Sequence, residues 1–423
     1  MRPLPPIPDW VTLEHQVAQL LQTQEENGWT FNERAAWELT STLQKEYEET
    51  VKILRDRHPQ IEGASFTPKR NNRTQGYVQG ATLTRLKELN PTSRDHIAWI
   101  LQTHYGWIPS SLTLTGKPVI DEVILKEIGT EISMMFYKCL DLTKKLGMLS
   151  EGNNAWLKLV TKSKIHHHCS VATNTHRCSH RNPNLSQVPS DERFRKLFTV
   201  SQDKIMVGAD LSGIELRMLA HYLHPYDGGR YSDILLNGDI HQVNADKIGI
   251  SRRLVKTVTY AFLYGAGDIK IGYSYSQCLS EDKARTKGKE IRRAFIDAIP
   301  GLAKLLKAIK DASKRGFIRS IDGRKIEVDS AHKALNYCLQ SSAGVIAKRW
   351  MVIANETIHT HPYFTANQLA FIHDELQFET TPKYEHDIRF TLELSAARAG
   401  EYYNTRIPIA AESKSGRNWA EVH

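Results

Sequence analysis

The 423-residue sequence lacks the features that mark secreted and membrane proteins. Its five cysteines are odd in number, scattered and free of any C-x-x-C pair, which argues against a disulfide framework and fits a reducing cytosol. They are Cys139, Cys169, Cys178, Cys278 and Cys338. No apolar run reaches about 18 residues, the length of a membrane span, and no charged leader precedes an apolar stretch. We therefore expect a cytoplasmic protein with no membrane partner.

Acidic residues are also in the minority. The sequence has 56 Lys and Arg against 47 Asp and Glu, a formal net charge of +9, which favours a polyanionic partner. A hydrophobic content of 40% supports a packed globule, and the length exceeds one ordinary core, so two or three subdomains are expected.

Metal-ligand spacing of the zinc-finger kind is missing as well. A run of three histidines and a cysteine at 166–169 is followed by Cys178 and His180. The eight residues between Cys169 and Cys178 do not match a finger, in which paired ligands lie closer. The spacing therefore does not favour a zinc site.

A cationic and aromatic stripe is the most informative feature that is present. Arg252, Lys256, Tyr260 and Tyr264 follow one another at four-residue spacing, so a helix would place them on one face. Cations followed by flat rings suit a triphosphate followed by a sugar and a base. The alternative is a surface stripe of snorkelling cations with two half-buried tyrosines.

Acidic residues at predicted strand ends form a second signal. The apolar run 205–209 predicts a buried strand with Asp210 at its carboxyl end. The segment 369–378 predicts a β-hairpin with Asp374 beside its turn. Carboxylates placed there are costly unless a cation binds them, and hard divalent ions take such ligands. Asp210 and Asp374 could therefore hold two Mg²⁺ ions, although an N-cap and a turn residue are the simpler alternatives.

Three motifs in this order resemble the family A (Pol I-type) DNA polymerases, in particular the replicative polymerases of short-tailed bacteriophages. They are the Asp-x-Ser-x-x-Glu-Leu-Arg element at 210–217, the Arg-x₃-Lys-x₃-Tyr helix at 252–264 and the His-Asp-Glu turn at 373–375. The resemblance covers nearly the whole chain as a polymerase domain. It implies an α+β right-hand polymerase fold with an antiparallel-sheet palm, helical fingers and a helical thumb, and a host-cytoplasm location if a phage encodes the chain.

The resemblance also implies roles for individual residues. Asp210 and Asp374 would hold two Mg²⁺ ions, with Glu375 as an auxiliary acid, and Glu215 would exclude a ribose 2′-hydroxyl. Arg252, Lys256 and His241 would contact the triphosphate of a dNTP, Lys256 would also act on the leaving pyrophosphate, and Tyr260 would lie against the sugar and base. The implied primer and template contacts are Arg177, Asn184, Gln187, Tyr264, Gly265, His332, Asn336, Gln340 and His373.

Two positions depart from the family pattern, because His176 and Ala261 stand where glycine is usual. Both side chains restrict the conformations that the backbone can adopt there.

The expected organisation is a thumb at 1–150 with a basic tip at 58–90, a palm at 151–224 and 331–423, and fingers at 225–330. Helices are expected near 11–26, 31–57, 94–104, 121–148 and 383–404, with Asn32 as an N-cap and a strand at 407–412.

The implied function is template-directed 5′→3′ DNA synthesis from a primer. Family members usually carry an exonuclease domain before the thumb, so we expect no proofreading by this chain and a separate exonuclease or processivity protein as partner. A single-subunit RNA polymerase and a two-metal nuclease are the alternatives. Glu215 and the spacing of the stripe favour deoxyribonucleotides, and a nuclease would need no stripe.

Overall fold

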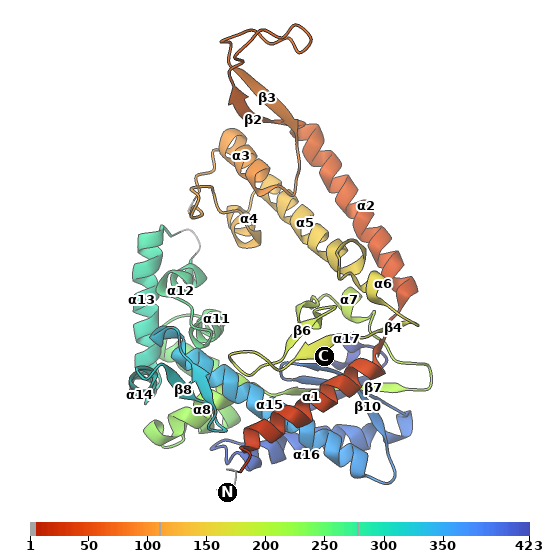
Figure 1. Cartoon of the computed structure of the whole chain (residues 1–423). Coiled ribbons are helices and arrows are strands. Elements are labelled where there is room, and N and C mark those ends of the chain that lie inside the picture. The colour runs from red at the N-terminus through yellow and green to blue at the C-terminus, as the bar shows by residue number, and fades with distance from the viewer. Residues whose placement is uncertain (1–5, 110, 277–278) are drawn as a thin grey trace, which may run out of the picture. The chain divides into compact units, whose positions relative to one another are not determined.

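A computed structural model describes residues 6–109, 111–276 and 279–423, so Cys278 lies outside the described residues. The chain divides into two compact units, one of Ala36–Leu157 and one of Met1–Ala35 with Lys158–His423. We call them the small unit and the large unit (Figure 1). In the described parts of the chain, no helix is long and apolar enough to cross a membrane.

A four-stranded antiparallel sheet lies at the centre of the large unit, in the order β10, β11, β7, β12. Its strands span Ala366–Ile372 (β10), Glu375–Thr380 (β11), Ile205–Leu211 (β7) and Ala411–Gly416 (β12). The hairpin and the strand predicted around the two acidic motifs are both present. The strand predicted at 407–412 begins later, because Ile407 and Ile409 enter the core as irregular chain before pairing starts at Ala411.

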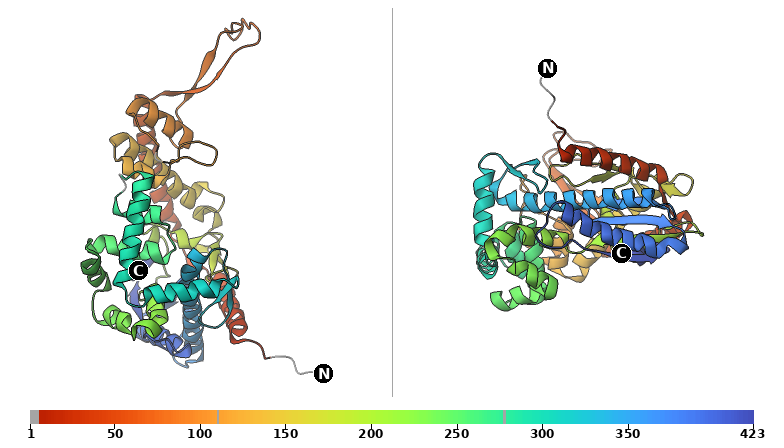
Figure 2. Two further views of the ribbon diagram at one scale, coloured as in Figure 1. Left: turned by 90° about the vertical axis from the view of Figure 1, so that its left-hand side faces the viewer. Right: turned by 90° about the horizontal axis from the view of Figure 1, so that it is seen from below.

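Three long helices pack on this sheet and on one another (Figure 2). They are α1 (Asp9–Asn27), α15 (Ala334–Thr360) and α16 (Glu385–Tyr402). α1 buries Leu13, Val17 and Leu21 in the same core as the sheet. The apolar face of α1 is covered by β10 and α15 within the large unit.

A helical region follows β7 within the large unit. It comprises α8 (Ile214–Asp227), α9 (Arg230–Asn237), α10 (Ile240–Ile248), α11 (Arg252–Leu263), α12 (Asp268–Tyr275), α13 (Glu281–Ala298) and α14 (Leu302–Ser313). The backbones of α12 and α13 approach closely. A Cβ on Gly288 would lie 1.7 Å from the Asp268 carbonyl oxygen, so only glycine fits there.

Short elements complete the large unit. Antiparallel pairs join β1 (Trp29–Thr30) to β4 (Lys164–Ile165), β5 (His168–Ser170) to β6 (Ser179–Arg181), and β8 (Phe317–Arg319) to β9 (Lys325–Glu327). The remaining turns and helices are Leu185–Gln187, α7 (Glu192–Arg195), Ala331–Lys333, Pro382–Tyr384 and α17 (Trp419–Val422).

The small unit is mainly helical. It contains most of α2 (Glu33–Arg57), then β2 (Gln60–Phe66), β3 (Leu83–Glu88), α3 (Arg94–Tyr105), α4 (Glu122–Ile128), α5 (Glu131–Leu146), the turn Gly147–Glu151 and the first residues of α6 (Trp156–Leu159). Asn32 caps α2 as predicted, since its Oδ1 accepts from the Ala35 N–H. The single helix predicted at 121–148 is two helices, because Gly129 adopts a left-handed conformation and Thr130 caps the next helix.

The stretch 58–90 is exposed, as predicted, but it is more regular than its composition indicates. β2 and β3 pair to form a hairpin, with a register shift between Glu62 and Ser65. Their side chains are mostly exposed. The strands are therefore held mainly by backbone pairing, which leaves little apolar periodicity for a sequence pattern to detect.

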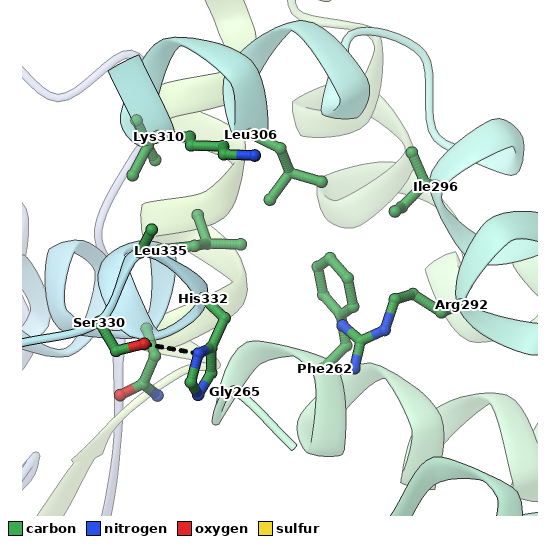
Figure 3. A pocket seen from close by; sticks show the side chains of 12 residues that line it. Phe262, Gly265, Arg292, Ile296, Leu306, Lys310, Ser330, His332 and Leu335 are labelled. Carbon is green, nitrogen blue, oxygen red and sulfur yellow. Dashed lines mark hydrogen bonds between the residues drawn. The ribbon is translucent and has the colours of Figure 1, made fainter. Parts of the chain in front are cut away.

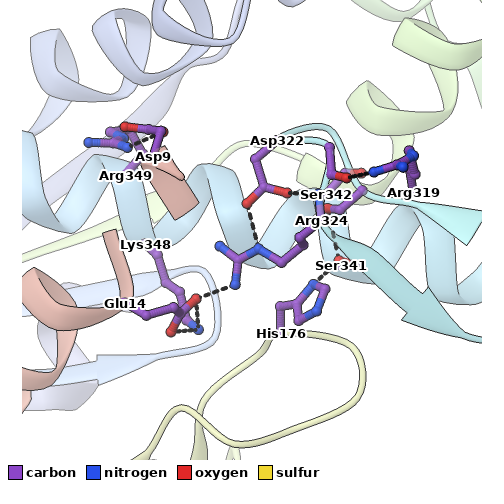
Figure 4. Close-up of polar contacts among 12 residues, drawn as sticks. Asp9, Glu14, His176, Arg319, Asp322, Arg324, Ser341, Ser342, Lys348 and Arg349 are labelled. Carbon is purple, nitrogen blue, oxygen red and sulfur yellow. Dashed lines mark hydrogen bonds and ion pairs between the residues drawn. The ribbon is translucent and has the colours of Figure 1, made fainter. Parts of the chain in front are cut away.

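Buried ion pairs fasten α1 to α15 and to the β8–β9 hairpin (Figure 4). Lys348 Nζ lies 2.7 Å from Glu14 Oε2, and the Lys348 side chain is only 1% exposed. The buried Arg324 guanidinium pairs with both Glu14 and Asp322. Glu14 thus faces two cations that have little access to water.

Glu14→Gln is expected to destabilise the large unit by about 3–5 kcal/mol, because removing one partner leaves buried charge without compensation. Urea unfolding followed by tryptophan fluorescence measures the effect. Glu281→Gln is the matched control, since Glu281 pairs with Arg285 on the exposed surface of α13, where about 0–1 kcal/mol is expected. Equal shifts for the two variants would contradict the assignment.

Candidate active site

Two aspartates meet at one end of the central sheet. Asp210 lies in β7 directly across from Glu375 of β11, and Asp374 lies in the β10–β11 turn. The backbone N–H of Leu211 donates to the Asp374 carbonyl oxygen at 3.0 Å, which fixes the turn beside the end of β7. The sheet therefore brings together the two acids that the sequence separates.

The electrostatics of this end of the sheet favour a bound cation. Burial, followed by the charge of Glu375, raises the pKa of Asp210 to about 6. Burial, followed by the charge of Asp210, raises the pKa of Asp374 to about 7. Both carboxylates lack a compensating positive charge strong enough to offset these effects. A divalent ion would supply it, and carboxylate oxygens are suitable ligands for such an ion.

Glu375 is held by hydrogen bonds and an ion pair. Its Oε1 accepts from Trp419 Nε1 at 2.6 Å and from Gln377 Nε2 at 2.5 Å. Its Oε2 lies 3.2 Å from His423 Nδ1. Both carboxylate oxygens of Glu375 therefore have partners within the protein. Its main effect at this site is electrostatic, because its negative charge raises the pKa of Asp210.

Three residues of this site were missed from the sequence. A recess of about 320 Å³ beside Asp210 is lined in part by Glu412, Lys414 and His423. Glu412 is the cross-strand partner of Asp210 on its other side, and its charge also raises the pKa of Asp210. The sequence carries no signal for this contact, because β12 and β7 pair in space although about half of the chain separates them in sequence.

Glu215 connects α8 to two predicted primer and template residues. Its Oε1 accepts from Arg177 Nη2 at 2.7 Å and from the Tyr264 hydroxyl at 3.0 Å. The charge of Glu215 also contributes to the raised pKa of Asp374. Glu215, Arg177 and Tyr264 therefore form one hydrogen-bonded group beside the acidic pair.

The predicted stripe lies on α11 and the residue that follows it. Ser251 caps the helix, and Arg252 and Lys256 are exposed while Tyr260 is half-buried. The Tyr260 and Tyr264 rings stack with centroids 6.5 Å apart. The opposite face of the helix is buried and apolar, so the stripe is the accessible face. Burial, with smaller effects from the charges of Glu215 and Asp374, raises the pKa of Tyr260.

His241 and Arg252 meet through Asp239, a residue that sequence reasoning did not select. Arg252 Nε donates to Asp239 Oδ2 at 2.7 Å, and the other carboxylate oxygen caps α10 by accepting from the His241 and Gln242 N–H groups. His241 is buried, 6.2 Å from the Tyr260 ring centroid to centroid. A ligand anion at Arg252 would therefore compete with Asp239.

The loop that carries Arg177 shows how the chain tolerates His176 in place of glycine. His176 adopts a φ of 57°, in the left-handed region, where glycine is usually found. Its Nδ1 lies 2.5 Å from Ser341 Oγ of α15. This contact between the His176 and Ser341 side chains holds the left-handed backbone conformation, which a glycine would adopt without such support.

The other predicted duplex contacts are not all available to a ligand. Asn184 Oδ1 accepts from the Ser186 N–H and hydroxyl, while Gln187 is exposed and Gln340 is partly exposed. Asn336 is buried, and its Nδ2 donates to the Leu263 carbonyl oxygen at 2.8 Å. In this structure Asn336 therefore secures the end of α11.

His332 and Gly265 line a separate pocket of about 470 Å³ between α11, α13 and α14 (Figure 3). His332 lies in the turn before α15, and its Nδ1 is 2.6 Å from Ser330 Oγ. Phe262, Arg292 and Leu306 supply part of the wall. Phe262 is only 5% exposed and the Arg292 guanidinium pairs with Asp268 at 2.6 Å, so both side chains are engaged within the protein.

His373 lies apart from this pocket, in the β10–β11 turn. Its φ is 61°, and its ring meets His180 edge to face at 5.5 Å. Burial lowers its pKa, so the ring is neutral at pH 7. Glu215, Arg177 and Tyr264 thus lie beside the acidic pair, whereas His332 and Gly265 line the separate pocket and Asn336 makes a structural contact.

Comparison with known proteins shows what kind of enzyme this is. Residues 64–421 match DNA polymerase family A. The DNA-directed DNA polymerases of Enterobacteria phage T3 and Escherichia phage T7 are each 32% identical over 98% of this chain and 70% of their own length. The POL domain of Pol1 from M. smegmatis, in complex with DNA primer-template and dNTP, has the same fold, with a TM-score of 0.77 and 20% identity over 97% of this chain and 70% of that chain.

The α+β fold, with its antiparallel sheet and the helical region after β7, is that of a polymerase domain of the right-hand class, as the family match and the likeness to the M. smegmatis POL domain show. The chain belongs to DNA polymerase family A, and it is a DNA-directed DNA polymerase. The family resemblance and the fold predicted from three sequence motifs are thereby confirmed.

Proposed function

We propose that this chain extends the 3′-hydroxyl of a primer with dNTPs, directed by a template strand, through two Mg²⁺ ions held by Asp210 and Asp374. The observation that carries this proposal is the pairing of two acids at the end of the sheet, the exposed Asp210 and the partly buried Asp374, each with a raised pKa, near a helix that presents cations and aromatics. When bound, the ions would lower the pKa of the primer hydroxyl and neutralise charge on the leaving pyrophosphate.

The residues of α11 would bind and orient the incoming nucleotide. Arg252 and Lys256 suit phosphate oxygens, and Lys256 also suits the departing pyrophosphate. Tyr260 offers a flat face for the sugar and base. His241 would reach the phosphates only after a rearrangement, since it is buried beside Tyr260 in this structure.

We assign the parts of the right hand as follows. The small unit, Ala36–Leu157, is the proposed thumb and would grip duplex DNA. The helices between 225 and 330 are the proposed fingers. The central sheet, with α1, α15 and α16, is the proposed palm. Primer-template DNA and dNTPs are the proposed ligands, which the solved POL domain of M. smegmatis also binds.

Gel-resolved primer extension tests the proposal. With Mg²⁺, all four dNTPs and a primed template, the chain should extend the primer to the template end, and omission of one dNTP should stop extension before the matching template base. Extension that ignores the omitted dNTP, or degradation of the primer in place of extension, would contradict it. The absence of exonuclease activity stays a prediction, and the lane without dNTPs measures it.

Divalent-ion use should depend on pH. Both aspartates have pKa values raised above 3.8, to about 6 and about 7, so protons occupy them as the pH falls from 8 to 6. Protons and Mg²⁺ then compete for the same oxygens. The Mg²⁺ concentration for half-maximal extension should rise roughly tenfold between pH 8 and pH 6. An unchanged requirement would argue that these acids do not bind the ion.

Glu215 is proposed to exclude the ribose 2′-hydroxyl. Glu215→Ala should reduce the preference for dNTP over NTP, measured as the ratio of kcat/KM values, by roughly 10–100-fold. Glu215→Gln has nearly the same shape and should retain the preference, although it weakens the contacts with Arg177 and Tyr264. Loss of the preference in both variants would indicate an electrostatic effect in place of a steric one.

A further inference from the structure

A buried cluster of metal-ligand side chains lies on the β5–β6 hairpin, apart from the two aspartates. The ligand atoms of His167, Cys169 and His180 all lie within 4.8 Å of one another, and all three residues are buried. Cys169 and His180 are direct cross-strand partners. His167 precedes Cys169 by two residues, so both project from the same face of the hairpin. The pairing of the strands brings together residues whose linear spacing matches no zinc finger.

One distance within the cluster is close to that of a tetrahedral zinc site, and all the ligand atoms lie within 4.8 Å of one another. Cys169 Sγ lies 3.2 Å from His180 Nδ1. Zinc bonds of roughly 2.0–2.3 Å separate neighbouring ligand atoms by roughly 3.3–3.8 Å. Small shifts of the three side chains, which widen the distance between Cys169 Sγ and His180 Nδ1 slightly, would therefore make room for the ion.

The amide of Gln24 on α1 lies beside two of the three ligand residues, His167 and Cys169. Gln24 Nε2 lies 3.0 Å from His167 Nε2 and 3.6 Å from Cys169 Sγ. An amide nitrogen donates and does not accept, so His167 Nε2 directs a lone pair at it. Gln24 Oε1 accepts from Gln368 Nε2 at 2.8 Å, which holds the amide in this orientation. A cation at the same point would replace these two hydrogen bonds, and Gln24 would turn away.

The protein alone does not satisfy every polar atom of the cluster. His180 Nε2 is buried and has no hydrogen-bond partner in the part of the chain that the structure describes. Burial lowers the pKa of His167 to about 3 and that of His180 to about 4, so both rings are neutral at pH 7, the form that binds metals. Burial raises the pKa of Cys169 to about 12, so its thiol would lose its proton to solvent only as a cation takes its place.

We propose that His167, Cys169 and His180 form a binding site for a zinc ion, with its fourth position at the place that the Gln24 amide occupies. Two imidazoles and one thiolate favour zinc, because zinc binds nitrogen and sulfur ligands whereas Mg²⁺ prefers oxygen ligands. The site would brace the turn that carries Asp374, because His180 packs edge to face against His373 at 5.5 Å. It is independent of the proposed Mg²⁺ site, and its ligands are different residues.

Metal analysis of the full chain tests this proposal. Protein purified from zinc-supplemented growth should hold about one zinc per chain, and zinc added to metal-free protein should release about one proton per ion from the Cys169 thiol. Replacement by Co²⁺ should give a thiolate-to-cobalt absorption band. Less than about a tenth of an equivalent of zinc, or a cobalt spectrum without a sulfur band, would overturn the proposal.

Variants locate the site. Cys169→Ser should abolish the cobalt band, whereas Cys139→Ser should retain it, since Cys139 is an equally buried free cysteine in the small unit. Asp374→Asn should keep its zinc, which separates this site from the proposed Mg²⁺ site. Gln24→Ala removes the competing amide and should bind zinc at least as tightly as the wild type. If Cys169→Ser fails to fold, X-ray absorption of the wild-type protein decides, because a zinc shell without sulfur would overturn the assignment.

Discussion

Asp210→Asn and Asp374→Asn are each expected to reduce single-nucleotide incorporation at least about 1,000-fold. Each variant removes a carboxylate that the ions need, and the several kcal/mol of charge stabilisation that such ions supply correspond to this factor. Rapid-quench primer extension with saturating Mg²⁺ and dNTP measures the effect. Primer-template affinity should change little, because neither acid carries positive charge toward the DNA backbone.

Asp203→Asn is the matched control for these variants. Asp203 is exposed and lies just before β7, at the opposite end of this strand from Asp210. The Asp203→Asn substitution therefore removes one negative charge without changing the end of the sheet that carries the two acids. It should extend primers at the wild-type rate. Incorporation by Asp210→Asn or Asp374→Asn within a few-fold of the wild type would contradict the roles proposed for the two acids.

Arg252→Ala and Lys256→Ala should each lower kcat/KM for a dNTP by roughly 100-fold, which corresponds to about 3 kcal/mol for a lost charge-assisted contact with phosphate. Both side chains are exposed on α11. Arg252 must first leave Asp239, so Asp239→Asn should weaken the competing ion pair and lower the KM for dNTP. Steady-state kinetics on a primed homopolymer measures all three variants.

Arg253 offers a control on the same helix. It is exposed and adjacent to Arg252, but it lies about 100° away around the helix axis. Arg253→Ala should therefore leave the kcat/KM for dNTP close to that of the wild type. A loss as large as that of Arg252→Ala would mean that general positive charge, and not the stripe, binds the triphosphate.

The sequence predicted well those features that depend on a short stretch of chain. The strand before Asp210, the hairpin around Asp374 and the α11 stripe all follow from local periodicity, and the structure has each of them. Asn32 was identified as a cap from the residues that follow it, and it caps α2. Local patterns are reliable here because the same residues both form the element and carry the signal.

Features that depend on distant segments were not predictable. The family resemblance implies a primer or template contact for Asn336, but the end of α11 lies against it and accepts its amide hydrogen bond. Glu412 and His423 reach the acidic pair only because β12 and the chain that follows it return beside β7. The spacing of His167, Cys169 and His180 is not that of a zinc finger, yet strand pairing brings the three residues together.

Manganese binding, measured by electron paramagnetic resonance, reports whether Asp210 and Asp374 hold divalent ions. Mn²⁺ substitutes for Mg²⁺ at carboxylate sites, and it is titrated into the protein with primer-template DNA and a non-hydrolysable dNTP. We expect about two bound ions per wild-type complex, and loss of at least one of them in both Asp210→Asn and Asp374→Asn. Unchanged manganese binding in both variants would contradict this expectation.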